Sequence, residues 1–269
     1  MESGTLAVPG AELYYEMRGA GPVLLLVNGG EGDAGAFEPL ATVLADHYTV
    51  ITYDPRGNSR SRLTGPLGEQ RIPQHARDAH LLLRALCREP AYLFGTSYGG
   101  MVVMDLLAAR PEQVRAAVAH EPLLVELLPD ADRWHAAFQE VYETFEREGS
   151  PAALLRLSGL LGVAAPPEVS DTLPPPLAAM LARVHVNMSF CLAYELRSFV
   201  RYVPHLEALR SGKFTLAGSG EADGTLGHRT ARALADLLGL EIAGFPGGHA
   251  GFLTHPAEFA KTLYAVLND

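Results

Sequence analysis

Cysteine is scarce in this chain of 269 residues, with only Cys87 and Cys191. Neither has a second Cys or a His at the spacing of a metal-ligand motif, so we expect two buried thiols and no bound metal. Long hydrophobic runs are also missing, since no stretch reaches the ~18 apolar residues that cross a bilayer. Residues 1–15 lack the basic start and apolar run of a secretory signal. These absences predict a cytoplasmic protein without membrane association.

Positive charge is in short supply as well. The chain has 21 Lys and Arg against 31 Asp and Glu, a formal net charge of −10. Such a balance repels phosphate backbones and anionic lipid surfaces, which disfavours nucleic-acid binding. Hydrophobic residues make up 48% of the chain and charged ones 19%, as in soluble globular proteins, and the length fits one core or one core plus an insertion.

Short apolar runs alternate with helical patterns, which is typical of a mostly parallel sheet with helices on both faces. An antiparallel edge strand is expected at 12–18, where apolar residues alternate with polar ones. Further strands are predicted at 23–27, 48–53, 91–95, 114–119, 214–217 and 240–245. Helices are predicted at 37–45, 72–87, 99–110, 230–238 and 256–267.

The strand signal almost disappears between residues 121 and 216, which indicates a helical insertion. Asp130 is a candidate cap for a first helix, Ser150 and Pro151 open a second, and 177–202 reads as mostly helical. The aromatic and methionine side chains of this segment either pack the helices together or line a lid over a site. We therefore divide the chain into a core, 1–122 and 206–269, and a helical cap, 123–205.

Ser97 is the candidate nucleophile. It is the central residue of Gly95-Thr96-Ser97-Tyr98-Gly99, which lies between a predicted strand and a predicted helix. In that setting the motif G-x-S-x-G forms a sharp turn that pushes the serine hydroxyl out of the sheet. The glycines two residues to either side are needed because side chains there would collide.

A serine hydroxyl needs a base to accept its proton, and we expect a histidine on a loop after the last strand. His249 meets this condition, because it lies in a glycine-rich loop between strand 240–245 and the terminal helix. His255 is the competitor. It precedes Pro256 at a helix start, which favours a capping or surface role.

A tetrahedral intermediate also needs backbone N–H donors for its oxyanion. Tyr98, the residue after the nucleophile, is one candidate. The loop Asn28-Gly29-Gly30 after strand 23–27 supplies the other, with Gly30 our first choice and Gly29 the second. This glycine-rich loop lacks the G-x-G-x-x-G and GK[ST] patterns of nucleotide sites.

With these motifs in this order, the chain resembles the α/β-hydrolase fold family over essentially its whole length. Asn28 stands where many relatives have His-Gly or Pro-Gly before the oxyanion residue. The resemblance implies an α/β fold with a mostly parallel central sheet flanked by helices, and a helical cap inserted after the sixth strand. In the family, the loop Asp54-Pro55-Arg56-Gly57-Asn58-Ser59 is mainly architectural, so no catalytic role is carried over to it.

The acid that orients His249 has three candidates. In most of the family it follows the strand that corresponds to 214–217, where Glu221 and Asp223 lie. A minority place it one strand earlier, at Glu121. The segments His120-Glu121-Pro122 and Pro246-Gly247-Gly248-His249 look like those of the zearalenone lactonases and kindred esterases. That resemblance implies Glu121, with Asp223 as the alternative.

The hypothesis is a serine hydrolase that cleaves a carboxylic ester or lactone through an acyl-enzyme, with Ser97, His249 and Glu121 as triad and the amides of Gly30 and Tyr98 as oxyanion hole. No cofactor or metal is expected. The partner is a largely apolar small-molecule substrate, and a homodimer is possible. Two alternatives stay open: a cofactor-free C–C hydrolase, cyclase or lyase of this fold, and a ligand-binding receptor.

Overall fold

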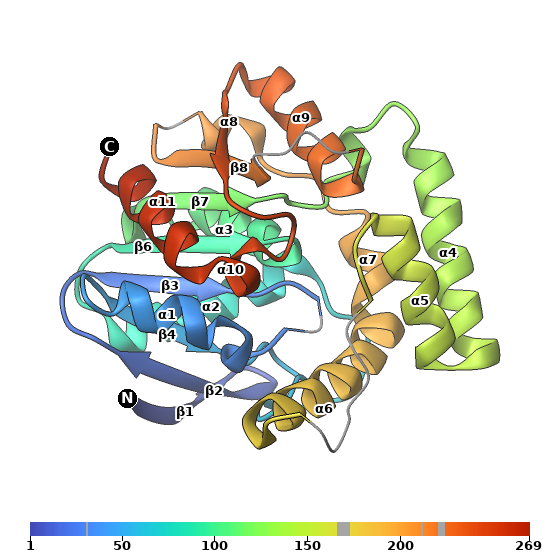
Figure 1. Ribbon diagram of the computed structural model, residues 1–269, viewed down its shortest axis with the longest axis horizontal. Coiled ribbons are helices and arrows are strands. Elements are labelled where there is room, and N and C mark those ends of the chain that lie inside the picture. The colour runs from blue at the N-terminus through green and yellow to red at the C-terminus, as the bar shows by residue number, and fades with distance from the viewer. Residues whose placement is uncertain (31, 166–172, 211, 220–223) are drawn as a thin grey trace.

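The computed structural model describes residues 1–30, 32–165, 173–210, 212–219 and 224–269. Its centre is a nine-stranded sheet in the order β1-β2-β4-β3-β6-β7-β8-β9, with β5 paired to β2 (Figure 1). Neighbouring strands from β4 to β9 run parallel, whereas the pairs that involve β2 are antiparallel. The strands are β1 Glu2–Val8, β2 Ala11–Arg18, β3 Val23–Val27, β4 Thr49–Tyr53, β5 Arg62–Leu63, β6 Ala91–Thr96, β7 Val114–His120, β8 Phe214–Ser219 and β9 Ile242–Phe245.

The central strands are apolar on both faces. In β3, Leu24 and Leu26 belong to one buried cluster, while Leu25 and Val27 belong to another on the opposite face. A parallel sheet covered by helices on both sides requires this, because neither face meets water. The near-continuous leucine run of β3 is therefore the sequence signature of a central strand that is buried on both faces.

Helices cover both faces of the sheet. The packing of buried residues places α1, α10 and α11 on one face, and α2, α3 and α9 on the other. Figure 1 shows α1, α10 and α11 in front of the strands. The bounds are α1 Glu38–Leu44, α2 Ile72–Leu86, α3 Tyr98–Ala109, α9 Leu226–Leu238, α10 Gly251–Thr254 and α11 Pro256–Asn268, with short 3-10 turns η1 Ala34–Phe37, η2 Pro111–Gln113 and η3 Val125–Leu127.

Three details differ from the expectation. Strands β1 and β5 were not predicted, and both precede the cap. With the five predicted strands that precede it, they make β7, after which the cap begins, the seventh strand of the chain. Strand β5 has two residues, which is too short for a periodic signal. Helix α9 begins four residues early, at Leu226, because the Thr225 hydroxyl caps it by accepting the His228 N–H.

The inserted segment is helical, as predicted. Its helices gather on one side of the sheet (Figure 1). Pro151 lies in the first turn of the second helix. Asp130 occupies the cap position of the first, but its carboxylate does not cap the helix, because it bonds Trp134 at 3.1 Å and Arg229 at 2.9 Å. The bounds are α4 Ala131–Glu148, α5 Ser150–Leu161, α6 Pro175–Phe190, the π-helical turn η4 Cys191–Glu195 and α7 Leu196–Phe199. The short helix α8, Leu206–Leu209, follows this segment and lies near β8, apart from these helices (Figure 1).

The cap shares its apolar core with the sheet. Phe138 and Met188, two members of the aromatic and methionine set, are buried in the cluster that also holds Leu25 and Met101. The packing interpretation therefore holds for these two side chains. The division of the chain at residues 122 and 205 stays a prediction, since one cluster runs across it.

Helix α6 fastens the cap to two loops of the core. Arg183 donates to the buried carboxylate of Asp33 at 2.5 Å. Asn187 accepts the Ser59 N–H at 2.7 Å and donates to the Ser59 hydroxyl at 2.9 Å. The Ser59 hydroxyl in turn donates to Asp33 at 2.9 Å. These bonds join the cap, the loop after β3 and the loop after β4.

Cys87 and Cys191 are not joined by a disulfide. Cys191 is buried as expected, whereas Cys87 is only half-buried because it ends α2 near the surface. Burial nevertheless raises the pKa of the Cys87 thiol to about 11. Over the described parts of the chain, no helix is both long enough and apolar enough to span a bilayer.

Candidate active site

Ser97 lies at a strained turn between β6 and α3. Its backbone angles, φ 53° and ψ −122°, are rare for a residue with a side chain. A Cβ at Gly95 would collide with the Gly99 carbonyl, and one at Gly99 with the Val27 carbonyl. The steric reason expected for the two glycines is confirmed, and the local geometry is that of a nucleophile elbow.

Glu121 contacts His249 directly. The distance from Glu121 Oε2 to His249 Nδ1 is 2.7 Å, and the Ser219 N–H donates to Glu121 Oε1 at 2.9 Å. Burial by itself would raise the pKa of the Glu121 carboxyl. The hydrogen bond and charge of His249, with help from His120 and the Ser219 amide, lower that pKa to about 2. Glu121 is therefore a buried carboxylate that is ionised at neutral pH.

The backbone at Glu121 is as unusual as that at Ser97. Its φ of 44° lies in the left-handed region, where side chains are rare. The Glu121 N–H still bonds the Ala217 carbonyl at 3.0 Å, and Gly227 of α9 packs against the side chain. A Cβ at Gly227 would lie 3.0 Å from Glu121 Oε2. Strain that is held in place by its surroundings is typical of functional sites.

The parallel register brings Ser97 and Glu121 to the ends of adjacent strands. Thr96 pairs with His120 in the ladder of β6 and β7, and the Ser97 N–H donates to the His120 carbonyl at 2.9 Å. His249 comes from the loop after β9, at the same end of the parallel sheet. Three segments far apart in the chain thus meet where the sheet ends, which is where ligands bind in open α/β sheets.

Asn28 organises the loop after β3. Its side chain accepts the Gly29 N–H at 2.9 Å and donates to the Asp33 carbonyl at 3.2 Å. The Gly29 carbonyl accepts the Gly32 N–H at 2.9 Å, which closes a turn. The Gly29 N–H is therefore engaged within the loop, which favours Gly30, at φ 44°, as the oxyanion donor. The asparagine that replaces the usual family pattern has a structural role here.

The loop Asp54–Ser59 is architectural, in keeping with the expectation. The Asp54 carboxylate accepts the Ala34 N–H at 2.9 Å and is paired with Arg60 at 2.7 Å. Arg56 forms a buried, two-bond ion pair with Asp78, at 2.5 and 2.6 Å. These contacts fix the loop against the strands and the neighbouring helices.

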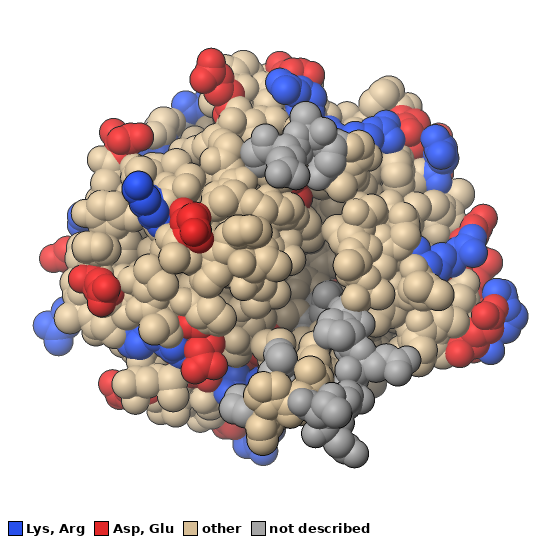
Figure 2. Space-filling view, viewed as in Figure 1, with Lys and Arg blue, Asp and Glu red and all other residues tan. Residues whose placement is uncertain are grey.

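Two cavities border the cap. A narrow one lies beside the loop after β3, which we call the oxyanion loop because it holds the candidate donor Gly30. It is lined by Asn28, Gly30 and Tyr98 of the core together with Glu195 and Phe199 of the cap. On the face of the molecule seen in Figure 2, a hollow separates core and cap, and its visible walls are mostly uncharged. Charged side chains are therefore scarce along the visible part of this hollow.

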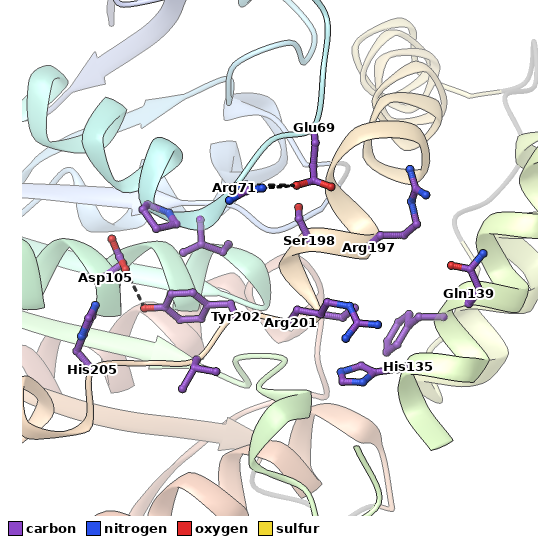
Figure 3. Close-up of a pocket in the computed structure, with 15 residues that line it drawn as sticks. Glu69, Arg71, Asp105, His135, Gln139, Arg197, Ser198, Arg201, Tyr202 and His205 are labelled. Atoms are coloured by element: carbon purple, nitrogen blue, oxygen red, sulfur yellow. Dashed lines mark hydrogen bonds and ion pairs between the residues drawn. The ribbon is translucent and has the colours of Figure 1, made fainter. Parts of the chain in front are cut away.

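The second cavity is larger, about 640 Å³, and lies between α2, α4 and the segment around α7. Figure 3 shows Arg71, Arg197 and Arg201 on one part of its wall and the Tyr202–Asp105 hydrogen bond on another. Neither Ser97 nor His249 lines it. They do not line the narrow cavity either, but the candidate oxyanion donors Gly30 and Tyr98 do, so the larger cavity is the one set apart from the candidate site.

The remaining predicted residues are accounted for as follows. The His255 side chain is exposed, and among the described residues its one hydrogen bond is to the hydroxyl of its neighbour Thr254, at 2.9 Å. Glu221 and Asp223, the alternative acids, lie outside the described residues. Three polar residues of the narrow cavity were not predicted: Tyr53, His75 and Glu195. His75 and Glu195 lie in helical segments, and a single His or Glu in such a segment forms no motif that the sequence could reveal.

Comparison with known proteins defines the class. A family model described as alpha/beta hydrolase fold matches residues 22–172, and the chain belongs to this family.

The chain is similar to the uncharacterized hydrolase YraK of Bacillus subtilis (strain 168), with 35% identity covering 99% of this chain and 96% of YraK. The zearalenone hydrolase of Bionectria ochroleuca is 28% identical, covering 96% and 94%. A thermophilic esterase structure from Thermogutta terrifontis superposes with a TM-score of 0.76 at 19% identity, covering 100% and 98%. These relatives support a hydrolase of the α/β fold.

Proposed function

We propose that this protein is a serine hydrolase that cleaves a carboxylic ester or lactone. The observation that carries the proposal is the combination of a strained serine after β6 with the His249 imidazole paired to Glu121, a buried carboxylate that follows the next strand in the sheet. Such a constellation converts a weakly nucleophilic hydroxyl into a reactive one, because the imidazole accepts its proton.

In the proposed reaction, Ser97 attacks the carbonyl carbon while His249 Nε2 takes the hydroxyl proton. Glu121 on Nδ1 holds the imidazole in the required tautomer and stabilises the imidazolium that forms. The amides of Gly30 and Tyr98 stabilise the oxyanion. His249 then protonates the departing alkoxide. Water next attacks the acyl-enzyme, with His249 again accepting a proton, now from the water, and returning it to the Ser97 oxygen as the acid leaves.

The substrate is proposed to be largely apolar. The mostly uncharged hollow in Figure 2 and the apolar side chains beside the oxyanion loop, such as Val102 and Phe199, support this. Lactone cleavage draws its support from the similarity to the zearalenone hydrolase. For a lactone the leaving alkoxide stays tethered, so a single ring-opened hydroxy acid is the product.

The test is covalent labelling with a serine-directed fluorophosphonate, followed by peptide mass spectrometry. We expect one adduct, on Ser97, that forms in the wild type and not in Ser97→Ala. The same variant should lose at least about 10³-fold in kcat/KM on a 4-nitrophenyl ester and keep its circular dichroism spectrum. Normal turnover by Ser97→Ala, or an adduct on another serine, would remove Ser97 as the nucleophile.

A further inference from the structure

The narrow cavity beside the oxyanion loop has a polar end that the proposed catalytic steps do not use. Tyr53 at the end of β4, His75 in α2 and Glu195 in the cap all line it. They are nearly inaccessible to solvent, with exposures of 2%, 5% and 2%. Burial of three such groups in one place is costly unless each finds a hydrogen-bond partner.

Two of these groups have no hydrogen-bond partner among the described residues. Tyr53 Oη and His75 Nε2 are buried, and neither has a hydrogen bond to any described residue. His75 Nε2 lies 3.6 Å from Glu195 Oε1, which is beyond a good hydrogen bond. Buried polar atoms in native proteins are satisfied in the great majority of cases, so groups left open beside a catalytic centre are candidates for ligand recognition.

A π-helical turn carries Glu195 to this position. The turn η4, Cys191–Glu195, interrupts an otherwise continuous helix, and such turns occur frequently at functional sites. It is held to the core, because the Tyr194 carbonyl accepts the Gln70 N–H at 2.8 Å. Glu195 is therefore presented by a fixed and locally irregular segment of the cap.

The charge state of the cluster is defined by its surroundings. Burial, assisted by the nearby Arg56 guanidinium, lowers the pKa of His75 to about 3. The imidazole is neutral in the working pH range and offers one donor and one acceptor. Arg56 is itself matched by its buried partner Asp78. An anionic ligand group at this point would face the Glu195 side chain, and no Lys or Arg is among the described residues that line the cavity.

The cluster lies next to the proposed oxyanion hole, and Phe199 packs between the two. The Phe199 ring makes edge contacts with His75 and with Tyr98, at centroid distances of 5.2 and 5.1 Å. Asn28, Gly30 and Tyr98 form the wall of the same cavity. A group that enters it from a bound ester therefore lies beside Gly30 and Tyr98, whose amides are proposed to bind the oxyanion.

We propose that Tyr53, His75 and Glu195 recognise a hydroxyl group that the substrate carries near its scissile ester. The inference rests on the proposed hydrolase function and narrows its substrate class to hydroxylated esters. A hydroxyl accepts a hydrogen bond from Tyr53 or His75 and donates one to Glu195, so a single small neutral group meets both needs. The cavity has a volume of about 10 Å³, which admits one water-sized group such as a hydroxyl, so the carbon skeleton of the ester lies outside it.

The experiment compares kcat/KM on matched esters. Ethyl butanoate is the reference, ethyl 3-hydroxybutanoate carries the hydroxyl on the acyl part, and 2-hydroxyethyl butanoate carries it on the alcohol part. We expect the wild type to prefer one hydroxylated ester by at least about 10-fold, because sites with buried polar groups reject analogues that leave them unpaired. The preferred ester shows which part of the substrate occupies the cavity.

The variants Tyr53→Phe and His75→Leu should each bring that ratio close to one. The matched control is Tyr48→Phe, because Tyr48 is an equally buried tyrosine whose hydroxyl already accepts a hydrogen bond from Asn268 at 2.7 Å, far from the cavity. This control should keep the wild-type ratio. Circular dichroism and the melting temperature confirm that each variant is folded.

The outcomes separate the two proposals. Ester hydrolysis that depends on Ser97 but shows no hydroxyl preference would overturn the recognition proposal alone, as would a preference that survives in both variants. A stronger preference for ethyl 3-aminobutanoate would also overturn it, since the ligand group would then be a cation. Loss of the Ser97 dependence, or no turnover of any ester, would overturn the hydrolase proposal itself.

Discussion

His249 Nδ1 lies 2.7 Å from Oε2 of Glu121, a residue that directly follows the strand next to that of Ser97. The contact fixes which ring nitrogen faces the carboxylate and leaves Nε2 for a second partner. Because Glu121 is 1% exposed and ionised, it stabilises a positive charge on the ring. The pair is thus arranged to support proton transfer at the imidazole.

Glu121→Gln is expected to lower kcat by about 10²–10⁴-fold. The amide keeps the shape of the side chain but removes the negative charge and permits the wrong imidazole tautomer, an effect of about 10⁴ in the best studied serine triad. Substrate binding depends on other groups, so KM should change little. Steady-state kinetics on a 4-nitrophenyl ester provide the measurement.

The control for this variant is Glu126→Gln. Glu126 also faces a histidine, His135, at 3.1 Å, but this pair lies in the cap beside the larger cavity. It should keep wild-type kcat. Asp223→Asn tests the remaining alternative: a collapse of kcat there, with normal activity in Glu121→Gln, would transfer the acid role to Asp223.

Much of the core could be predicted because its signals are local. The leucine run of β3 and the motif around Ser97 depend on burial and on backbone sterics at a few successive positions. Glu121 could be named only as one of three acids, since its contact with His249 spans 128 residues of chain. The order of β7, β8 and β9 in the sheet, which brings the two together, is a property of the whole fold.

The close approach of Gly29 to the elbow predicts a sensitive position. A Cβ there would lie 2.7 Å from Ser97 Cβ and 2.8 Å from the Thr96 carbonyl oxygen, so the loop or the elbow must move. We expect Gly29→Ala to lose about 1–3 kcal/mol of unfolding free energy and about 10²-fold in kcat, since small displacements of catalytic groups are costly. Urea denaturation and ester kinetics measure the two effects.

Gly159→Ala is the matched substitution. Gly159 lies in α5 with open space around its Cβ position, so alanine should raise the unfolding free energy by about 0.5–1 kcal/mol and leave kcat unchanged. Equal effects of the two substitutions on kcat would show that the loop after β3 does not press on the elbow.

The cap was less predictable than the core, for a physical reason. Its helices show the apolar periodicity of packing, but their attachment depends on polar pairs such as Asn187 with Ser59, 128 positions apart. The position of Glu195 could not be predicted from the sequence either. Its burial follows from a π-helical turn within a helix, and no capping or breaking residue in the sequence marks that turn.

The attachment of α6 gives a prediction about stability. Arg183→Gln should lower the unfolding free energy by about 1–3 kcal/mol, because Asp33, which is fully buried, loses its charged partner. Arg156→Gln is the control, since Arg156 pairs with Glu140 on the exposed surface of the cap. It should cost less than about 0.5 kcal/mol. Similar losses in both would mean that the Asp33 contact does not anchor the cap.

Two buried histidines predict how stability depends on pH. Burial, together with Arg56, lowers the pKa of His75 to about 3. Burial lowers that of His120 to about 4, although Glu121 opposes this shift. In the unfolded chain both titrate near the ordinary value of 6.5. Between pH 6.5 and 4 the unfolded state therefore binds more protons, so the unfolding free energy must fall as the pH is lowered.

The expected slope is up to about 1.4 kcal/mol per pH unit for each of these histidines. Glu121 adds a loss in the same direction only below its ordinary pKa of 4.5, because its folded pKa is about 2. Urea denaturation of the wild type and His75→Leu at several values between pH 5 and 6.5 isolates the histidine contribution. The variant should have the shallower slope, since it lacks one group that the unfolded chain protonates; parallel slopes would mean that His75 takes up its proton equally in both states.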